Sequence, residues 1–335
     1  MLINNTMKNI VTIGGGTGSF VLLSGLKKYP VNLTAIVSMA DDGGSTGRLR
    51  DELGVLPPGD VRQCLVALSE SSEEMRALMN YRFENGGLEG HNFGNILISA
   101  LEKISGNFVK GAEEAGKILN IKGEVIPVSE QDMRLLIKLK NGKVLKGEAQ
   151  LDHSREVRRI GIDKIYLKKK AKACQEALDR IRKADMIVIG PGDPYGSILP
   201  NLLVRSIKEA IGKSKARVVY VCNLTNRKGQ TDNFGLDDHV SLIEKYLGEK
   251  IIDYVIYNIQ EPPGNILKKY TRQEGKGAWV HFNEQSGKRD HYKVIKAKLL
   301  SAKLVRYSKA DAIAKTRSLI RHDPDKLAKL IISLL

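Results

Sequence analysis

Residues 9–18 read NIVTIGGGTG, a short apolar run that passes without a break into closely spaced glycines. The apolar run predicts a buried strand, and the apolar periodicity from Ser19 to Lys28 predicts a helix directly after the glycines. A second apolar run, from Leu33 to Met39, predicts the next strand. Strand, glycine turn, helix and strand open a parallel sheet that has helices on both faces. The sequence therefore predicts an α/β fold with a Rossmann-like, doubly wound, mostly parallel sheet.

The pattern changes near residue 120. The residues then alternate like half-buried strands, and this alternation covers 124–128, 134–139 and 144–149. Asn141-Gly142 adds a strong hairpin signal. We therefore expect a small β-rich insertion at 121–170, inside a Rossmann-like core formed by residues 1–120 and 171–335.

The α/β rhythm on either side of the insertion supplies the remaining expected elements. Helical periodicity predicts early helices at 61–69, behind an Asp60 cap, at 73–83 and at 95–104. It predicts later helices at 173–183 and 325–335. Apolar runs predict strands at 186–189, 218–222, 254–258 and 278–281.

The first glycine turn is the strongest candidate binding site. Residues without side chains let backbone N–H groups approach a phosphate, and the positive end of the helix dipole adds to the attraction. Ser19 stands where a G-x-G-x-x-G fingerprint has its last glycine, so the match to a dinucleotide motif is incomplete. The alternative is that these glycines serve only a tight turn and close helix packing. We favour phosphate binding, by Gly14, Gly15, Gly16, Thr17 and Gly18.

Two adjacent carboxylates, Asp41 and Asp42, follow the second predicted strand. A carboxylate at this place commonly accepts a hydrogen bond from a ribose hydroxyl. The pair also has the chemistry to hold Mg²⁺, although adjacent residues on an extended segment point apart. One of the two is therefore expected to cap the turn that follows. We interpret the glycine-rich runs at 43–47 and 85–90 as segments that close over a ligand.

Polar candidates also come from three further loops. His91, Asn92 and Asn95 precede a predicted helix, and amide groups suit sugar hydroxyls or a base edge. Helix capping by the asparagines is an alternative of equal weight. A second strand-to-helix glycine turn supplies Gly192, and the end of a later strand supplies Asn223. Two such turns on one parallel sheet predict a ligand in the crevice between them.

Charge is the unusual feature of the composition. The 335 residues include 54 Lys and Arg against 38 Asp and Glu, a net charge of +16. The first 100 residues hold 8 basic and 10 acidic side chains, so the excess lies in the rest of the chain, with its densest run at 168–172. The basic residues are spread over several elements without a recognition motif, and aromatic residues are only 5%. A nucleic-acid partner is therefore not favoured.

Other classes of protein and site are also disfavoured. No window approaches the roughly 20 apolar residues of a membrane span, and no signal peptide is recognised. We therefore expect no membrane insertion. The three cysteines lie far apart and show no C-x-x-C spacing, which is typical of a protein in the reducing cytoplasm, so we expect a cytoplasmic protein. The sequence has no nucleophile elbow, H-E-x-x-H motif or Walker lysine, and we interpret His239 as structural. Binding is thus better supported than catalysis, and we lean towards a protein that is not an enzyme.

A series of motifs runs along the chain in a fixed order: IGGGTG from Ile13, ADDGGS from Ala40, RLR from Arg48, GVLPPGD from Gly54, GHNFGN from Gly90, GPG from Gly190, SILPNLL from Ser197, TD from Thr231 and RHD from Arg321. Together they resemble the YvcK family of bacterial gluconeogenesis factors, within the CofD-like superfamily. The resemblance extends from residue 9 to the C-terminus.

That resemblance implies a non-enzymatic, cytoplasmic protein that binds UDP-N-acetylglucosamine. It implies support of cell shape and peptidoglycan synthesis on gluconeogenic carbon sources, with no required cofactor and with Mg²⁺ as an optional ion. The glycine turn would face the pyrophosphate, and Arg321 resembles the family's C-terminal arginine that UDP-sugar binding needs. A guanidinium beside a diphosphate is chemically sensible. We also expect a homo-oligomer and a protein partner in cell-wall synthesis.

The superfamily also implies an alternative function. A CofD-like 2-phospho-L-lactate transferase would use a nucleotide diphosphate donor and Mg²⁺, with Asp41 or Asp42 as the metal ligand. Two places depart from the family pattern. Asp193-Pro194 and Gly196 stand where many relatives carry a Ser-Leu pair and a threonine, so contacts from that loop are not carried over. Pro324 stands where some relatives carry a threonine, so regulation through a hydroxyl is not expected there.

Overall fold

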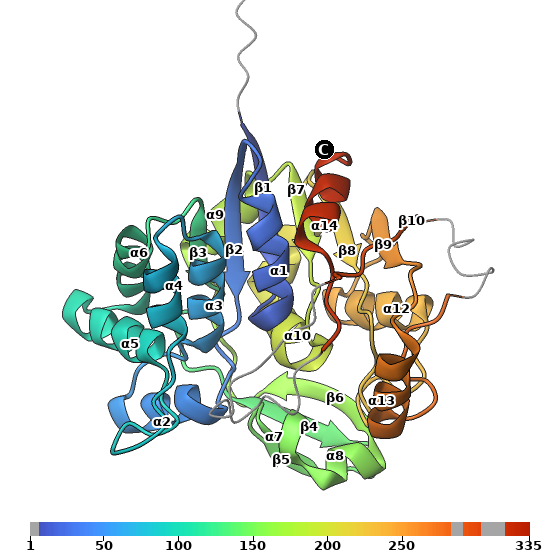
Figure 1. Ribbon diagram of the computed structural model, residues 1–335, viewed down its shortest axis with the longest axis horizontal. Coiled ribbons are helices and arrows are strands. Elements are labelled where there is room, and N and C mark those ends of the chain that lie inside the picture. The colour runs from blue at the N-terminus through green and yellow to red at the C-terminus, as the bar shows by residue number, and fades with distance from the viewer. Residues whose placement is uncertain (1–6, 283–290, 303–318) are drawn as a thin grey trace, which may run out of the picture.

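Seven strands form a sheet through the centre of the molecule, in the order β10-β9-β8-β7-β1-β2-β3 (Figure 1). The computed structural model describes residues 7–282, 291–302 and 319–335. All pairings between neighbouring strands of this sheet are parallel, so the predicted Rossmann-like architecture is confirmed. The strands are β1 (Lys8–Ile13), β2 (Val31–Val37), β3 (Glu124–Pro127), β7 (Met186–Ile189), β8 (Arg217–Val221), β9 (Tyr254–Asn258) and β10 (Lys293–Ala297).

The strand order reverses between β1 and β7. From β1 the chain moves outward through β2 and β3, and it then returns to β7 and moves outward on the other side. In open α/β sheets, ligands bind at the carboxyl ends of the strands beside such a reversal. Ile10, Val11 and Ile13 of β1 are at most 1% exposed, so this crevice stands on the fully packed centre of the core.

Helices connect the strands and cover the sheet (Figure 1). α1 (Gly16–Leu26) packs against α3 (Gly59–Leu68) and α14 (Pro324–Ile332). Within the described ranges, no helix combines the length and the apolar character that crossing a bilayer demands. The other helices of the core are α2 (Gly44–Leu53), α4 (Glu73–Asn80), α5 (Phe93–Ser105), α6 (Phe108–Ile118), α9 (Gln175–Arg182), the π-helical turn η1 (Pro194–Ile198), α10 (Leu199–Leu202), α11 (Arg205–Lys213), α12 (Leu236–Leu247) and α13 (Gly264–Glu274).

A second, antiparallel sheet lies at one end of the molecule, in the order β5-β4-β6 (Figure 1). Its hairpin turn is Asn141-Gly142, as predicted, and Gly142 adopts φ +89° there. The small sheet starts later than the insertion predicted at 121–170. β3 belongs to the large sheet, where Glu124 pairs with Thr34 of β2. β3 is the edge strand of the large sheet and is buried from Val125 to Pro127, so it belongs to the core and not to the insertion. The elements of this subdomain are β4 (Leu135–Leu139), β5 (Val144–Lys146), α7 (Gln150–His153), α8 (Arg155–Ile160) and β6 (Ile162–Leu167).

Three local expectations differ from the structure. The strand predicted at 278–281 is wrong, because Trp279 and His281 form only isolated bridges and β10 is the outer strand. Helix α6 was not predicted from its sequence. It begins after Asn107, whose side chain accepts a hydrogen bond from the Lys110 N–H at 2.9 Å. The run at 43–47 starts helix α2, and a Cβ on Gly47 would lie 2.1 Å from the Asp42 carbonyl oxygen.

The contact between α1 and α14 depends on a glycine and gives a first prediction. A Cβ on Gly25 would lie 2.1 Å from the carbonyl oxygen of Pro324. Gly25→Ala should therefore lower the free energy of unfolding by about 1–3 kcal/mol, although alanine is the better helix former. The matched control is Gly87→Ala, because a Cβ on Gly87 would have no neighbour within 4 Å. Thermal unfolding followed by circular dichroism measures both, and equal melting temperatures would contradict this account of the packing.

Candidate functional site

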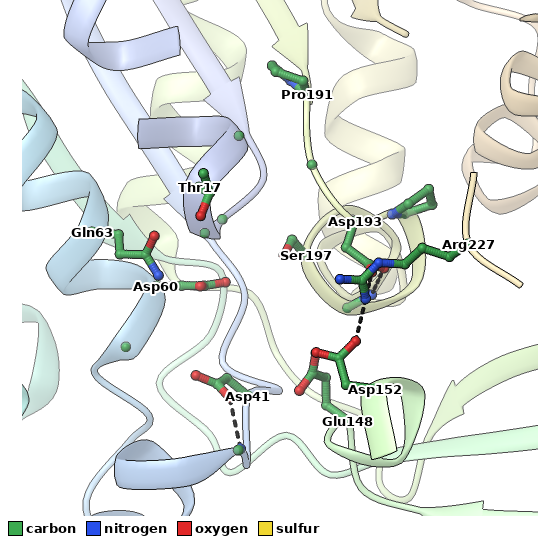
Figure 2. Close-up of a pocket in the computed structure, with 18 of the residues that line it drawn as sticks. Thr17, Asp41, Asp60, Gln63, Glu148, Asp152, Pro191, Asp193, Ser197 and Arg227 are labelled. Carbon is green, nitrogen blue, oxygen red and sulfur yellow. Dashed lines mark hydrogen bonds and ion pairs between the residues drawn. The ribbon is translucent and has the colours of Figure 1, made fainter. Parts of the chain in front are cut away.

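A cavity of about 300 Å³ opens at the carboxyl ends of β1 and β7, where the strand order reverses (Figure 2). Its walls come from the β1–α1 turn, the starts of α2 and α3, the β5–α7 segment, the β7–η1 turn, the loop after β8 and residues 320–322. The two predicted glycine turns therefore meet at one cavity. The small sheet contributes part of the wall, which the sequence did not indicate.

The β1–α1 turn lies against its neighbours at distances that only glycine allows. A Cβ on Gly15 would lie 2.0 Å from Asp60 Oδ2, and a Cβ on Gly18 would lie 2.0 Å from the Pro191 carbonyl oxygen. Gly16 adopts φ +63°, in the left-handed region that favours glycine. These glycines are therefore required by close packing as well as by the turn.

The same turn places the start of helix α1 at the cavity. Gly15 is the N-cap of α1 and brings no side chain to the helix start. Gly14 is outside the cavity lining, and its N–H donates to the carbonyl oxygen of Ile36 at 3.2 Å. The cavity is lined by the other predicted members of the turn: Gly15, Gly16, Thr17 and Gly18.

The β7–η1 turn forms the opposite wall. Gly192 and Asn223 both line the cavity, as predicted, and Asn223 Nδ2 donates to the Gly192 carbonyl oxygen at 2.7 Å. Asp193 caps η1, where its Oδ1 accepts from the Gly196 N–H at 2.9 Å. This loop, whose contacts the resemblance does not carry over, lines the cavity.

Asp41 and Asp42 point in different directions, as expected for neighbours on an extended segment. Asp41 lines the cavity, and its Oδ1 accepts from the Gly43 N–H at 2.9 Å. Asp42 is outside the lining and faces the small sheet, where its Oδ1 accepts from the Ala149 N–H at 2.8 Å. The first carboxylate is therefore available to a ligand, and the second anchors the subdomain.

The His91-Asn92-Asn95 group is mainly structural. Asn92 is the N-cap of α5 and accepts from the Asn95 N–H at 3.2 Å, so the capping alternative applies to it. His91 Nδ1 lies 3.3 Å from Ser45 Oγ, and burial together with nearby Arg48 lowers the pKa of His91. Only Asn95 lines the cavity. Its Oδ1 accepts from Nε of Arg62 at 2.9 Å.

Five carboxylates gather at the cavity, and the sequence had singled out only Asp41 as a ligand group. In Figure 2 they face the cavity from several segments of the chain, with Glu148 and Asp152 both on the β5–α7 segment: Asp41, Asp60, Glu148, Asp152 and Asp193.

Arg227 joins two of these carboxylates. Its guanidinium donates to Asp152 and forms an ion pair with Asp193 Oδ2 at 2.8 Å, so it links the small sheet to the β7–η1 turn. The ion pairs and the neighbouring acids raise the pKa of Arg227 further above its ordinary value, despite burial. The arginine therefore stays charged at all physiological pH values and stabilises the carboxylates around it.

Glu148 is the most perturbed carboxyl group of the cavity. Burial, followed by repulsion from Asp41 and Asp152, raises the pKa of Glu148 well above its ordinary value. Burial likewise raises the pKa of Asp41. The space for Glu148 depends on Gly196, because a Cβ there would lie 2.5 Å from Glu148 Oε1. Gly196 thus accommodates an acidic group.

The carboxylates do not form a ready-made metal cage. Among the described residues, one group of three metal-type ligand atoms lies within 4.8 Å of one another, at Glu130, Cys174 and Glu176, outside the cavity. There the Cys174 thiol donates to Glu176, and burial raises its pKa to about 12, so it is not a thiolate ligand. A divalent cation in the cavity would need oxygen ligands from a bound molecule in addition to carboxylates such as Asp41.

Positive and neutral groups complete the lining. Arg321 lies in the wall formed by residues 320–322. Its neighbour His322 is 5% exposed, and burial lowers the pKa of His322 to about 4, so the ring is neutral at pH 7. Arg62 and Arg82 lie in the lining near α3 and α5. The cavity thus combines an acidic centre with guanidinium groups at its walls.

The family model of CofD, 2-phospho-L-lactate transferase, matches residues 10–300 of this sequence. The chain belongs to the CofD-like family. Within this family, the gluconeogenesis factor of Halalkalibacterium halodurans is 44% identical over 269 residues, covering 80% of this chain and 82% of that protein. The gluconeogenesis factor of Bacillus subtilis is 37% identical over 328 residues, covering 97% and 98%. The chain is therefore a member of the gluconeogenesis factor, or YvcK, branch of the CofD-like family.

A solved structure agrees with this assignment. A crystal structure of a UPF0052 family member from Bacillus halodurans matches with a TM-score of 0.88 and 39% identity, covering 98% of this chain and 99% of that chain. The likeness spans both the large sheet and the small one, because nearly the whole of each chain is included.

Sequence reasoning missed several groups of this CofD-like site. Asp60 was interpreted as a helix cap, whereas the N-cap of α3 is Pro58 and Asp60 lines the cavity. Asp60 is the last residue of the GVLPPGD motif, and this position is the sequence signal that could have indicated a place in the site rather than a helix cap. Glu148, Asp152 and Arg227 carry no local signal, because they meet only through the fold.

His239 is structural, as interpreted. It is 1% exposed, its Nε2 lies 2.9 Å from Asn226 Oδ1, and burial lowers its pKa to about 3.

The perturbed carboxyl group gives a prediction of pH dependence. The folded protein binds a proton at Glu148 more tightly than the unfolded chain does. The free energy of unfolding that depends on Glu148 therefore falls as the pH rises above the ordinary glutamate pKa. Glu148→Gln should therefore raise the melting temperature at about pH 8 and change it little at about pH 4, where both states are protonated. The exposed Glu113→Gln serves as control. A variant that melts lower than the parent at the higher pH would contradict the assignment.

Proposed function

We propose that this protein binds a nucleotide sugar, UDP-N-acetylglucosamine, in the cavity and acts as a regulator rather than as an enzyme. One observation carries the proposal. The start of α1 is built from closely spaced glycines, lines the cavity and lies where the strand order reverses. Backbone N–H groups and the positive helix end suit a diphosphate at this place.

The rest of the cavity suits the two ends of such a ligand. Gln63 and Asn95 lie on one side of the turn, and Asn223 and Thr225 lie on the other. Amide and hydroxyl groups supply both donors and acceptors, which sugar hydroxyls and a base edge require. The volume of about 300 Å³ falls at the lower end of the range for small-molecule sites.

The regulatory role is proposed from family membership. Relatives of similar length carry the name gluconeogenesis factor. We extend that name to support of cell shape and peptidoglycan synthesis on gluconeogenic carbon sources, in the cytoplasm, with no required cofactor. A homo-oligomer and a protein partner in cell-wall synthesis belong to the same proposal. Signalling of this kind requires that the ligand binds two conformations with different affinity.

The carboxylate cluster favours a second candidate, a CofD-like 2-phospho-L-lactate transferase. Asp41 would hold Mg²⁺ together with ligand oxygens, because Asp42 is engaged with the small sheet. The ion would neutralise charge on a nucleotide diphosphate. Glu148, whose raised pKa favours the protonated form, would be the group that holds a proton beside the reacting atoms.

Titration calorimetry with UDP-N-acetylglucosamine tests the proposal. We expect saturable heat with and without Mg²⁺. Arg321→Ala should weaken binding by about tenfold to a hundredfold, because a charge-assisted hydrogen bond is lost. Arg205→Ala is the control, since this arginine is exposed on α11 and outside the cavity.

The outcomes separate the two candidates. Absence of heat at millimolar ligand would contradict the nucleotide-sugar proposal. Formation of a phospholactyl product from a phospholactyl-nucleotide donor, dependent on Mg²⁺ and lost in Asp41→Asn, would establish the transferase instead.

A further inference from the structure

The small sheet carries an excess of positive charge that the cavity does not use. Residues 134–172 contain 13 Lys and Arg against 4 Asp and Glu, and 9 of the 13 are lysines. Two of the four acids, Glu148 and Asp152, line the cavity and are not available to neutralise the outer surface. The subdomain lies at one end of the molecule, away from α14 and the C-terminus (Figure 1).

The strand register places part of this charge on one face. Every second residue of β4 is buried, and the residues between them, Leu136 and Lys138, lie half exposed on the opposite face. Leu136 pairs with Tyr166 of β6, and Lys138 pairs with Lys164. On β5 their partners are Lys146 and Val144. We call this surface the basic sheet face, and it consists of Leu136, Lys138, Val144, Lys146, Lys164 and Tyr166.

Two lysines of the basic sheet face oppose each other directly. Lys138 and Lys164 are register partners, and like charges at such positions are destabilising. Lys138 Nζ lies 3.7 Å from Asp163 Oδ2, and an exposed ion pair of this kind contributes little to the stability of the fold. In the part of the chain that the structure describes, neither Lys146 nor Lys164 has a carboxylate within 4.0 Å. An external anion would relieve this repulsion.

The positive charge continues beyond the sheet face. Lys168, Lys169 and Lys170 follow β6 and are exposed. Arg155 and Arg159 of α8 are exposed in the same subdomain. The charge is therefore spread over a broad surface, which fits an extended anionic surface better than a single small anion.

We propose that the basic sheet face docks this protein on the surface of an anionic lipid bilayer. Lysine is depleted in protein–protein interfaces, whereas arginine and aromatic residues are enriched there, so the lysine-rich composition disfavours a protein partner. Tyr166, Leu136 and Val144 lie among the lysines, and such side chains suit the boundary between headgroups and acyl chains. Single-stranded nucleic acid needs several stacking aromatics, and this face has one.

The affinity comes from the sum of many weak attractions. Each basic side chain near an anionic bilayer strengthens binding by roughly fivefold, and added salt screens the effect. The inference does not depend on the ligand of the cavity, because the basic sheet face shares no residue with the cavity lining. Docking of this kind is peripheral and requires no membrane-spanning helix.

Co-sedimentation with lipid vesicles tests this proposal. The protein should bind phosphatidylcholine vesicles that contain phosphatidylglycerol, should not bind vesicles of phosphatidylcholine alone, and should be released by high salt. The combined variant Lys146→Glu, Lys164→Glu, Lys168→Glu should weaken binding by about a hundredfold or more, from roughly fivefold per lysine. The control variant is Lys183→Glu, Lys213→Glu, Lys215→Glu, which makes the same charge change at exposed sites before β7 and β8.

Circular dichroism first establishes that both triple variants retain the parent's fold. Failure of the parent protein to bind the anionic vesicles would overturn the proposal. Equal losses in the two triple variants would also overturn it, because they would show dependence on net charge alone. Tighter binding to duplex DNA than to the vesicles, lost in the first variant, would assign the face to nucleic acid instead.

Discussion

The carbonyl oxygen of Pro191 and the carboxylate of Asp60 lie where side chains of Gly18 and Gly15 would otherwise be. These contacts hold the β1–α1 turn against the β7–η1 turn and the start of α3, at the place where the strand order reverses. This closeness positions the start of α1 and the cavity in front of it. A Cβ on Gly18 would meet backbone and separate these walls, whereas a Cβ on Gly15 would displace the Asp60 side chain from its place at the cavity.

The attachment of the small sheet is the second constraint. Asp42 holds the backbone of Ala149, and Arg227 joins Asp152 to Asp193, so the subdomain completes the cavity wall. A ligand that changes the charge balance among these carboxylates would alter the contacts that hold the subdomain to the core. Because the basic sheet face lies on the same subdomain, the fold offers a physical route from the cavity to the outer surface.

Local sequence patterns predicted the parts of the protein that depend on neighbouring residues. The strand and glycine turn at 9–18 indicated the parallel sheet and a turn that lines the cavity, and Gly192 and Asn223 lie in the lining as well. Asn92 shows the limit of this reasoning, because the same residue type suits a helix cap and a ligand contact. Arg227 and Asp152 are 75 positions apart and meet only in the folded chain, so no local pattern could indicate them.

A crystal structure of the complex with UDP-N-acetylglucosamine would show where the diphosphate binds. We expect the diphosphate oxygens to accept hydrogen bonds from the backbone N–H groups of the β1–α1 turn, between Gly15 and Gly18. An ordered nucleotide sugar whose diphosphate lies away from this turn, with the start of α1 uncovered, would contradict this expectation.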